Sequence, residues 1–330
     1  MATTTRWGIL ATGSIAHQFA QGLADADGAE LIAVGSRSAD KAEAFGREFA
    51  VPNRHGSYEA LARDEDVDVV YIATPHPQHK PNALLCIAQG KAVLCEKPFT
   101  VNAGEAGEVV AAARDAGVFC MEAMWTRFLP ALAETRRLIA DGAIGDVRMV
   151  RADFGFRCDW DPQSRLLKAD LGGGGLLDVG VYCVSLASMV FGGALPQRAA
   201  GLAAIGATGV DEQAGYVLDY GDGRLAVLAS AVRTDTPKAA EILGTEGRIE
   251  LAPPFFKSEC LTLATGGKSR TIKAKLRGNG YNYQAEEVAR CFAEGLAESP
   301  IMPLDETLTV METLDTLRRQ WNLSYPMESA

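Results

Sequence analysis

Several residue types that carry chemistry in other proteins are scarce in this chain of 330 residues. It has only four histidines, and its seven cysteines include no Cys-x-x-Cys pair. Because no Cys/His cluster has the spacing of zinc ligands, we expect no metal site. The odd number of cysteines, mostly in apolar contexts, predicts reduced thiols rather than disulfides.

Long apolar runs and an excess of basic residues are also missing. No uninterrupted apolar run reaches the ~18–20 residues that a bilayer crossing requires. Acidic residues outnumber basic ones by 42 to 32, which argues against nucleic acid or an anionic membrane surface as a partner. Residues 1–6 show no export signal, so we expect a soluble, cytoplasmic protein with a small-molecule substrate.

Glycine and apolar residues, by contrast, are plentiful: the chain has 34 glycines and is 48% hydrophobic. The first 120 residues alternate strand and helix patterns, which predicts an α/β domain with a doubly wound parallel sheet of the Rossmann type. From residue 198 to 275 the sequence reads as strands joined by glycine turns, which predicts an α+β domain with a largely antiparallel sheet. We therefore expect two domains, 1–123 and 124–330.

A glycine-containing turn follows the first predicted strand and opens the first predicted helix. The string ATGSIA over residues 11–16 matches the dinucleotide-binding pattern G-x-G-x-x-G/A, with alanine in place of the first glycine. The helix N-terminus offers free N–H groups to a pyrophosphate. The predicted cofactor contacts in this turn are Ala11, Thr12, Gly13, Ser14 and Ile15.

The end of the second predicted strand distinguishes NAD from NADP. NAD-selective sites usually place an acidic residue there to bind the ribose 2′-hydroxyl. This chain instead has Ser36 and Arg37, with Lys41 one turn into the next helix. Because a guanidinium suits a 2′-phosphate, the sequence favours NADP, although a solvated basic pair at a helix start would look the same.

Two further segments carry chemistry-bearing side chains. Glu96 and Lys97 end a central strand, at the sheet edge where such folds bind ligands. Asp178 and Tyr182 are four residues apart on a predicted helix from Leu176 to about Val190, and therefore share one face. Alternatively, Glu96 and Lys97 are simply an ion pair on the surface. In the same way, Asp178 and Tyr182 can be read as a hydrogen-bonded polar pair with only a structural role in the helix.

Longer strings accompany these motifs: HPQHK over residues 76–80, the stretch 90–98 ending in EKP, and MEAMWTRF over 121–128. Together they resemble the Gfo/Idh/MocA oxidoreductase family over nearly the whole chain, most closely its branch acting on trans-dihydrodiols and D-xylose. The resemblance implies hydride transfer between NADP and a sugar or trans-dihydrodiol, with residues 1–123 binding NADP and 124–330 binding substrate. It also implies an open sheet in the second domain, buried in a homodimer or higher homo-oligomer.

The resemblance also implies roles for single residues. Much of the family has the helix motif Asp-x-Gly-x-x-x-His or a close variant, whereas this chain has Asp-x-Gly-x-Tyr over residues 178–182. Tyr182, rather than a histidine, is therefore the expected proton donor and acceptor, assisted by Lys97 and oriented with help from Asp178. Residues expected to line the cofactor are Thr74, Pro75, His76, His79, Glu96, Lys97, Trp125 and Arg127. Residues expected to face the substrate are Trp125, Phe154, Asp178 and Tyr182.

The chemistry of a tyrosine base requires such a partner. Free tyrosine, with a pKa near ~10, is a weak base at neutral pH, and a neighbouring ammonium favours the phenolate.

Two alternative functions stay open at this point. One is a sugar–sugar oxidoreductase that keeps NADP(H) tightly bound, and the other is a non-catalytic, NADP-binding regulatory protein.

Overall fold

The computed structural model describes residues 4–329, which form two compact units. The first unit consists of the residues up to Thr100, Gly104–Phe128 and Arg277–Thr307. The second consists of Val101–Ala103, Leu129–Leu276 and the residues from Leu308 onward. This division differs from a single boundary after residue 123, because the segment 277–307 returns to pack with the N-terminal residues.

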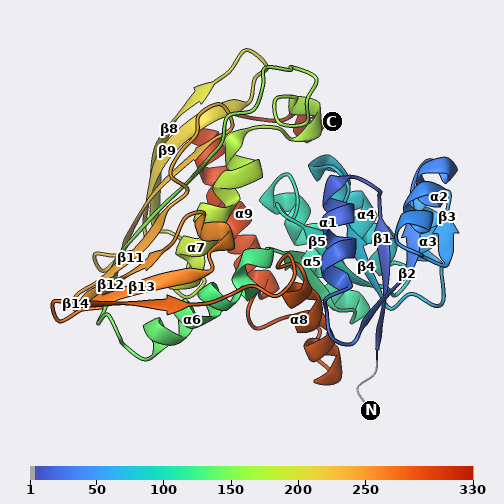
Figure 1. The fold of residues 1–330 in the computed structure, drawn as a ribbon. Helices are drawn as coiled ribbons and strands as arrows, with labels where there is room; N and C mark the ends of the chain where they lie inside the picture. Colours follow the sequence, from blue (N-terminus) through green and yellow to red (C-terminus); the bar gives the residue numbers. More distant parts are fainter. Residues whose placement is uncertain (1–3, 330) are drawn as a thin grey trace. The chain divides into compact units, whose positions relative to one another are not determined.

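The first unit holds a parallel sheet with its helices (Figure 1). Its elements are β1 (Thr5–Leu10), α1 (Ser14–Leu23), β2 (Ala29–Gly35), α2 (Ala39–Glu48), β3 (Asn53–His55), α3 (Tyr58–Ala62), β4 (Val69–Ile72), α4 (His79–Ile87), β5 (Ala92–Glu96), α5 (Ala103–Ala116), β6 (Cys120–Ala123) and α8 (Asn282–Ala293). The strand order β3-β2-β1-β4-β5-β6, parallel at each pairing, confirms the predicted Rossmann sheet. Ligands of such sheets bind where the strand order reverses, here between β1 and β4.

Burial explains why the central elements of this unit form. Every residue of β4 and β5 is buried, as expected of strands covered on both faces. Helix α1 buries Ala16, Phe19, Ala20 and Leu23, which repeat at helical spacing along one face. The short elements β3 and α3 were not expected, because three to five residues are too few for a periodic pattern to emerge.

The second unit is built on a mixed sheet. Its elements are α6 (Pro130–Ala140), β7 (Val147–Gly155), α7 (Val181–Val190), β8 (Arg198–Ile205), β9 (Asp211–Asp219), β10 (Leu225–Ala231), β11 (Ala240–Gly244), β12 (Gly247–Leu251), β13 (Cys260–Thr265), β14 (Lys268–Lys273) and most of α9 (Leu304–Gln320). The strand order is β14-β13-β12-β11-β7-β10-β9-β8, and among the described strands of this second sheet only β7 and β10 pair in parallel. The largely antiparallel sheet is therefore confirmed.

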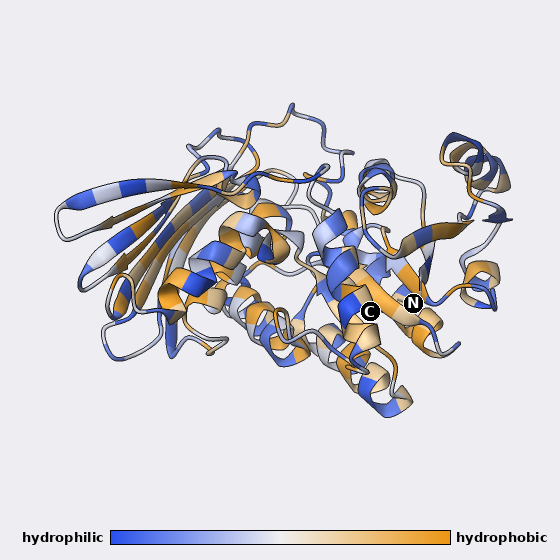
Figure 2. Cartoon of the chain, turned by 60° about the horizontal axis from the view of Figure 1, so that its bottom comes forward, coloured by the Kyte–Doolittle hydropathy of each residue, from blue (hydrophilic) through white to orange (hydrophobic). Residues whose placement is uncertain are grey.

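One face of this sheet packs on helices, and the other carries exposed apolar side chains. Helix α7 contacts β7 and β10. Hydrophilic and hydrophobic residues alternate along the strands, which is the pattern of a half-buried sheet (Figure 2). On the open face, Leu202, Val217 and Val227 are 84%, 40% and 40% exposed. Val217 and Val227 are directly paired across β9 and β10, so they form one apolar surface.

The helix predicted from Leu176 begins differently from the expectation. Residues Leu176–Gly180 form a π-helical turn, and the α-helix α7 starts only at Val181. The Tyr216 hydroxyl donates a hydrogen bond to the Gly180 carbonyl at 3.4 Å, and a Cβ at Gly180 would lie 2.9 Å from that hydroxyl. Tyr216 therefore packs closely against the end of this π-helical turn.

One stretch of this unit has the length and composition of a membrane span. It covers Ala169–Val190, yet 89% of its most apolar window is buried inside the protein. Burial of this kind is typical of a core helix, and the stretch packs on the sheet through α7.

Candidate active site

The predicted cofactor residues lie at or just after the carboxyl ends of five neighbouring strands in the first unit. After β1 come Ala11–Ile15, and after β2 come Ser36, Arg37 and Lys41. After β4 come Thr74, Pro75, His76 and His79. Strand β5 ends in Glu96 and is followed by Lys97, and after β6 come Trp125 and Arg127. The parallel topology thus brings residues that are far apart in the sequence to one edge of the sheet.

The turn after β1 keeps a glycine-like conformation although its first glycine is replaced. Ala11 has φ +96°, a left-handed value that costs a residue with a side chain of the order of 1 kcal/mol or more. Its N–H donates to the Gly35 carbonyl at 2.9 Å, which helps to hold this conformation. A Cβ at the exposed Gly13 would meet nothing within 4 Å, so the helix N-terminus is open to a ligand.

The residues after β2 are organised by a helix cap. The Ser38 hydroxyl accepts a hydrogen bond from the Lys41 N–H at 3.4 Å and thereby begins α2. Ser36 is buried, and its hydroxyl accepts from the Ser38 N–H at 3.3 Å. Arg37 and Lys41 are both exposed, and neither forms an ion pair with any residue in the described range 4–329. Two uncompensated cations therefore lie at this strand end.

His79 ties two of the strand ends together. Its ring is fully buried, and its nitrogens lie 2.8 Å from the carbonyl oxygens of Thr74 and Pro98. Burial lowers the pKa of His79, and the two carbonyl contacts oppose that change. The geometry gives His79 a positioning role for the loops after β4 and β5. His76 is also largely buried, whereas Pro75 is exposed.

The acidic residue at the end of β5 is buried and hydrogen-bonded. The Glu96 carboxylate accepts hydrogen bonds from the Tyr71 hydroxyl and, at 3.2 Å, from the Lys97 N–H. Tyr71 in turn stacks on Phe19 of α1, with ring centroids 3.7 Å apart. Lys97 is partly exposed and directly follows β5.

The chain after β6 meets the returning segment 277–307. Trp125 stacks on Tyr281 with centroids 4.7 Å apart and an interplanar angle of 14°. The buried Arg127 donates to Glu306 at 2.6 Å, an ion pair whose two side chains are almost fully enclosed. Arg127 therefore anchors the returning segment, and Tyr281 is an aromatic neighbour that the sequence pattern did not reveal.

Glu122 on β6 is an unforeseen buried carboxyl. It is fully buried, Oε2 accepts from the Thr307 hydroxyl at 3.2 Å, and Oε1 has no hydrogen-bond partner among the described side chains. Burial raises the pKa of Glu122 to about 7. The carboxyl therefore changes charge near neutral pH in the folded protein.

We expect Glu122→Gln to stabilise the protein at pH 8 more than at pH 5. A raised pKa means that the stability contributed by the protonated carboxyl is lost as the pH rises from about 4.5 through about 7, and glutamine avoids that loss. The gain at pH 8 should approach about 2–3 kcal/mol in the free energy of unfolding. Chemical denaturation at both pH values measures it, and Glu65→Gln at an exposed site serves as control. An equal effect at both pH values would contradict the assignment.

In the second unit, Tyr182 belongs to an aromatic cluster. It is 8% exposed, and its ring centroid lies 5.3 Å from that of Phe154 and 5.9 Å from that of Phe256. Phe154 and Phe256 stack at 4.1 Å with nearly parallel planes. The structure thus brings the predicted residues Phe154 and Tyr182 together and adds Phe256, whose partly exposed ring follows two prolines far along the chain.

Asp178 is buried and paired with an arginine from the preceding loop. Arg165 donates to Asp178 Oδ1 at 2.8 Å, with the Arg165 side chain 59% exposed. The carboxylate is thus held by a cation that the sequence pattern had not identified. No group of three or more His, Cys, Asp or Glu side chains within residues 4–329 is placed to hold a metal ion.

Family models match both halves of the chain. The oxidoreductase family with an NAD-binding Rossmann fold matches residues 5–124, and the GFO/IDH/MocA C-terminal domain matches residues 132–250. The chain belongs to the Gfo/Idh/MocA oxidoreductase family.

Full-length relatives are dehydrogenases. Trans-1,2-dihydrobenzene-1,2-diol dehydrogenase of Mus musculus is 40% identical over 333 residues, covering 98% of both chains. The enzyme of the same name from Xenopus tropicalis is 38% identical, covering 98% of this chain and 99% of the relative. The protein is therefore an enzyme, a dehydrogenase acting on CH–OH groups. Catalysis is confirmed over the regulatory alternative.

Solved structures share the fold. An aldose-aldose oxidoreductase from Caulobacter crescentus, complexed with glycerol, is 26% identical with a TM-score of 0.87, covering 96% of each chain. A 3-ketoreductase from Actinomadura kijaniata, in complex with NADP and TDP-benzene, is 24% identical with a TM-score of 0.84, covering 96% and 97%. This second likeness shows the fold alone.

The residues at the strand ends fit a nicotinamide dinucleotide. The first turn of α1 contains no acidic residue, and no side chain in the described part of the chain caps its N-terminus. Its N–H groups are thus available to a pyrophosphate, and the open space at Gly13 permits close approach. The protein accordingly has an NAD(P)-binding Rossmann fold.

Proposed function

We propose that the protein is an NADP-dependent dehydrogenase that transfers a hydride between the nicotinamide and a sugar or a trans-dihydrodiol. The observation that carries this proposal is the full-length likeness to trans-1,2-dihydrobenzene-1,2-diol dehydrogenases. The first unit is assigned to the nucleotide and the second to the substrate.

In this mechanism the chain's own residues manage the proton of the substrate hydroxyl. Bound NADP supplies the hydride acceptor. Tyr182 Oη takes the hydroxyl proton during oxidation and returns it during reduction. Because a phenolate needs a nearby cation at neutral pH, we assign Lys97 to provide that charge. Asp178, fixed by Arg165 at 2.8 Å, orients the reacting hydroxyl.

The preference for NADP rests on the end of β2. Arg37 and Lys41 are exposed there and form no ion pair within residues 4–329, so both can bind a 2′-phosphate. No acidic side chain follows β2 at the position where NAD-selective sites bind a ribose hydroxyl.

The aromatic cluster supports the proposed substrate class. Phe154, Phe256 and Tyr182 present ring surfaces that can pack on the apolar face of a pyranose or on a cyclohexadiene ring. Trp125 is assigned to the same substrate. The relatives act on a trans-dihydrodiol by name, which makes such diols the first compounds to test. D-xylose is tested beside them because the sequence resembles the branch of the family that acts on it.

A second candidate is a sugar–sugar oxidoreductase with tightly bound nucleotide, favoured by the likeness to the aldose-aldose oxidoreductase. Initial rates with a panel of aldoses and dihydrodiols, with NADP or NAD added, separate the two. Turnover that depends on added NADP supports the proposal. Turnover without added nucleotide, in protein that carries nicotinamide absorbance, supports the second candidate.

We also propose that the protein is a homodimer or higher homo-oligomer in the cytoplasm. The open face of the second sheet exposes Leu202, Val217 and Val227, an apolar surface that a second copy would cover. All seven cysteines are free thiols, as a reducing compartment permits.

We expect Leu202→Arg to lower the molecular mass in solution. Placing a charge at the most exposed leucine of the open face makes burial of that face unfavourable. Light scattering after size-exclusion chromatography measures the mass. Leu296→Arg, at an exposed leucine of the first unit, should leave it unchanged. An unchanged mass for Leu202→Arg would place the interface elsewhere.

A further inference from the structure

A buried arginine near the end of α9 forms the centre of a charged network. Arg318 is 4% exposed and donates to Asp315 at 2.6 Å and to both oxygens of Glu328 at 2.8 Å. Its guanidinium also lies over the Tyr325 ring, 5.1 Å from the centroid. Although burial raises the pKa of Glu328, the charge and hydrogen bonds of Arg318 together with the hydrogen bonds from the Tyr325 N–H and Asn102 outweigh that effect and keep the pKa below its ordinary value. Arg318 and Glu328 therefore form a charged pair at neutral pH.

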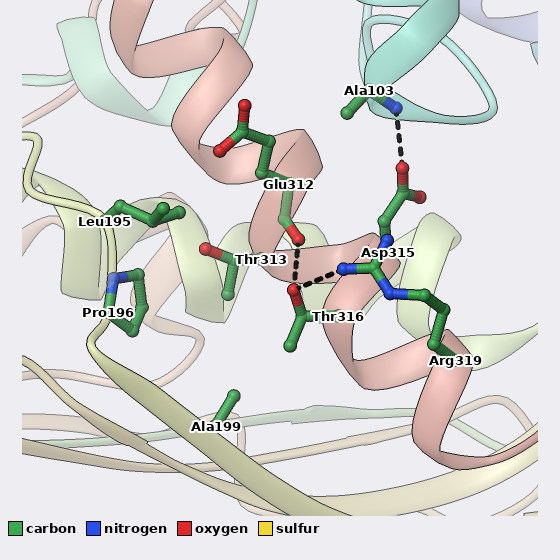
Figure 3. Close-up of a pocket in the computed structure, with 9 residues that line it drawn as sticks. All are labelled: Ala103, Leu195, Pro196, Ala199, Glu312, Thr313, Asp315, Thr316 and Arg319. Carbon is green, nitrogen blue, oxygen red and sulfur yellow. Dashed lines mark hydrogen bonds between the residues drawn. The ribbon is translucent and has the colours of Figure 1, made fainter.

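The network holds the chain a few residues after β5 and Lys97. Asn102 donates from Nδ2 to Glu328 at 3.0 Å. The Ala103 N–H donates to Asp315 Oδ2 at 2.8 Å, as Figure 3 shows. These residues belong to the second unit, although Lys97 is only five residues before Asn102 in the sequence. Asp315 thus fixes the beginning of α5.

The same network holds the glycine loop before Asp178. The Tyr325 hydroxyl donates to the Gly173 carbonyl at 2.7 Å, and Tyr325 is 1% exposed. A Cβ at Gly173 would lie 2.8 Å from the Leu166 carbonyl oxygen, so the loop is closely packed. From this loop the chain enters the π-helical turn that carries Asp178 and then α7 with Tyr182.

Stability alone does not account for this arrangement. A buried ion pair often contributes little net stability compared with apolar residues of similar volume. Moreover, Nε of Arg318 is buried with no hydrogen-bond partner in the described part of the chain, which is an unfavourable feature. The network carries this energetic cost and contacts both the chain at Asn102–Ala103 and the glycine loop at Gly173. These observations indicate that its role is to place the two segments precisely.

We propose that Arg318, through Tyr325, Glu328 and Asp315, is a positioning residue that holds the segment after Lys97 and the glycine loop before Asp178 in one framework. The inference rests on the proposed function, in which Lys97, Asp178 and Tyr182 carry the reaction. Because reactivity is sensitive to small displacements of reacting groups, loosening either segment should slow turnover more than it weakens binding.

The test is Tyr325→Phe, which removes only the hydroxyl bonded to Gly173. We expect kcat to fall roughly tenfold, with the KM values for substrate and NADP changed less than about twofold. In a Tyr182→Phe background the same change should cause no further loss, because there is no longer a proton-transfer group to position. Arg318→Lys, which keeps the charge but loses the planar fork, should lower kcat in the same way.

Trp321→Phe is the matched control, since it removes one indole N–H bonded to the Gly201 carbonyl at 2.9 Å at the end of the same helix. It should leave kcat unchanged. Wild-type kcat in Tyr325→Phe, or an equal loss in Trp321→Phe, would overturn the positioning role. Near-normal turnover in Tyr182→Phe alone would instead contradict the proposed function, so the two failures are distinguishable.

Discussion

Replacing Tyr182 by phenylalanine is expected to lower kcat by about 10²-fold or more while the affinity for NADPH stays unchanged. The substitution removes the hydroxyl that takes the substrate proton but retains the ring that packs against Phe154 and Phe256. The aromatic cluster should therefore persist. Steady-state kinetics gives kcat, and quenching of protein fluorescence by NADPH gives the dissociation constant.

Tyr283→Phe provides the control for this variant. Its hydroxyl accepts a hydrogen bond from the Arg277 N–H at 2.8 Å, so the substitution also removes one bonded phenolic oxygen. We expect wild-type kcat in the control. A loss confined to Tyr182→Phe supports the proton-transfer role, whereas near-normal turnover in that variant would refute it.

Replacing Arg37 by serine is expected to lower kcat/KM for NADP by about 30- to 100-fold, because charge-assisted hydrogen bonds to a phosphate are lost. The value for NAD, which lacks the 2′-phosphate, should change little. The ratio of kcat/KM for the two nucleotides therefore measures the effect directly.

Arg47→Ser is the matched control, since Arg47 is an exposed arginine in the last turn of the same helix α2. It should leave the nucleotide ratio unchanged. Equal losses for NADP and NAD in Arg37→Ser would show that Arg37 does not read the 2′-phosphate. A wild-type preference for NAD would also contradict the assignment of Arg37 and Lys41.

Local patterns were sufficient to predict the Rossmann sheet and its glycine turn. The turn at 11–16 was recognisable because the spacing of small residues follows directly from close approach of the backbone. The alternation of strands and helices likewise identified the parallel sheet, now seen in the order β3-β2-β1-β4-β5-β6. Each of these signals lies within a short window of sequence.

Partners from distant segments could not be predicted in this way. Tyr281 stacks on Trp125 only because residues 277–307 return to the first unit. The π-helical turn at Leu176–Gly180 is contacted by Tyr216, which approaches from β9. Such contacts are set by tertiary packing and leave no periodic signal in the chain.

The protein contacts of individual side chains could not be predicted from the motifs either. His79 was expected to line the cofactor, and its ring is fully buried against the carbonyls of Thr74 and Pro98. Arg127, expected at the nicotinamide, forms an enclosed ion pair with Glu306. Burial, which depends on neighbours from other elements, decides what each side chain contacts, and the cofactor roles of both residues stay predictions.

The most direct test of the account compares wild type and Tyr182→Phe in one assay of NADPH formation, with a trans-dihydrodiol or D-xylose as substrate. We predict that wild-type turnover requires added NADP, that NAD substitutes poorly, and that the variant loses about 10²-fold or more in kcat. Equal rates for the two proteins, or a wild-type rate independent of added NADP, would contradict it.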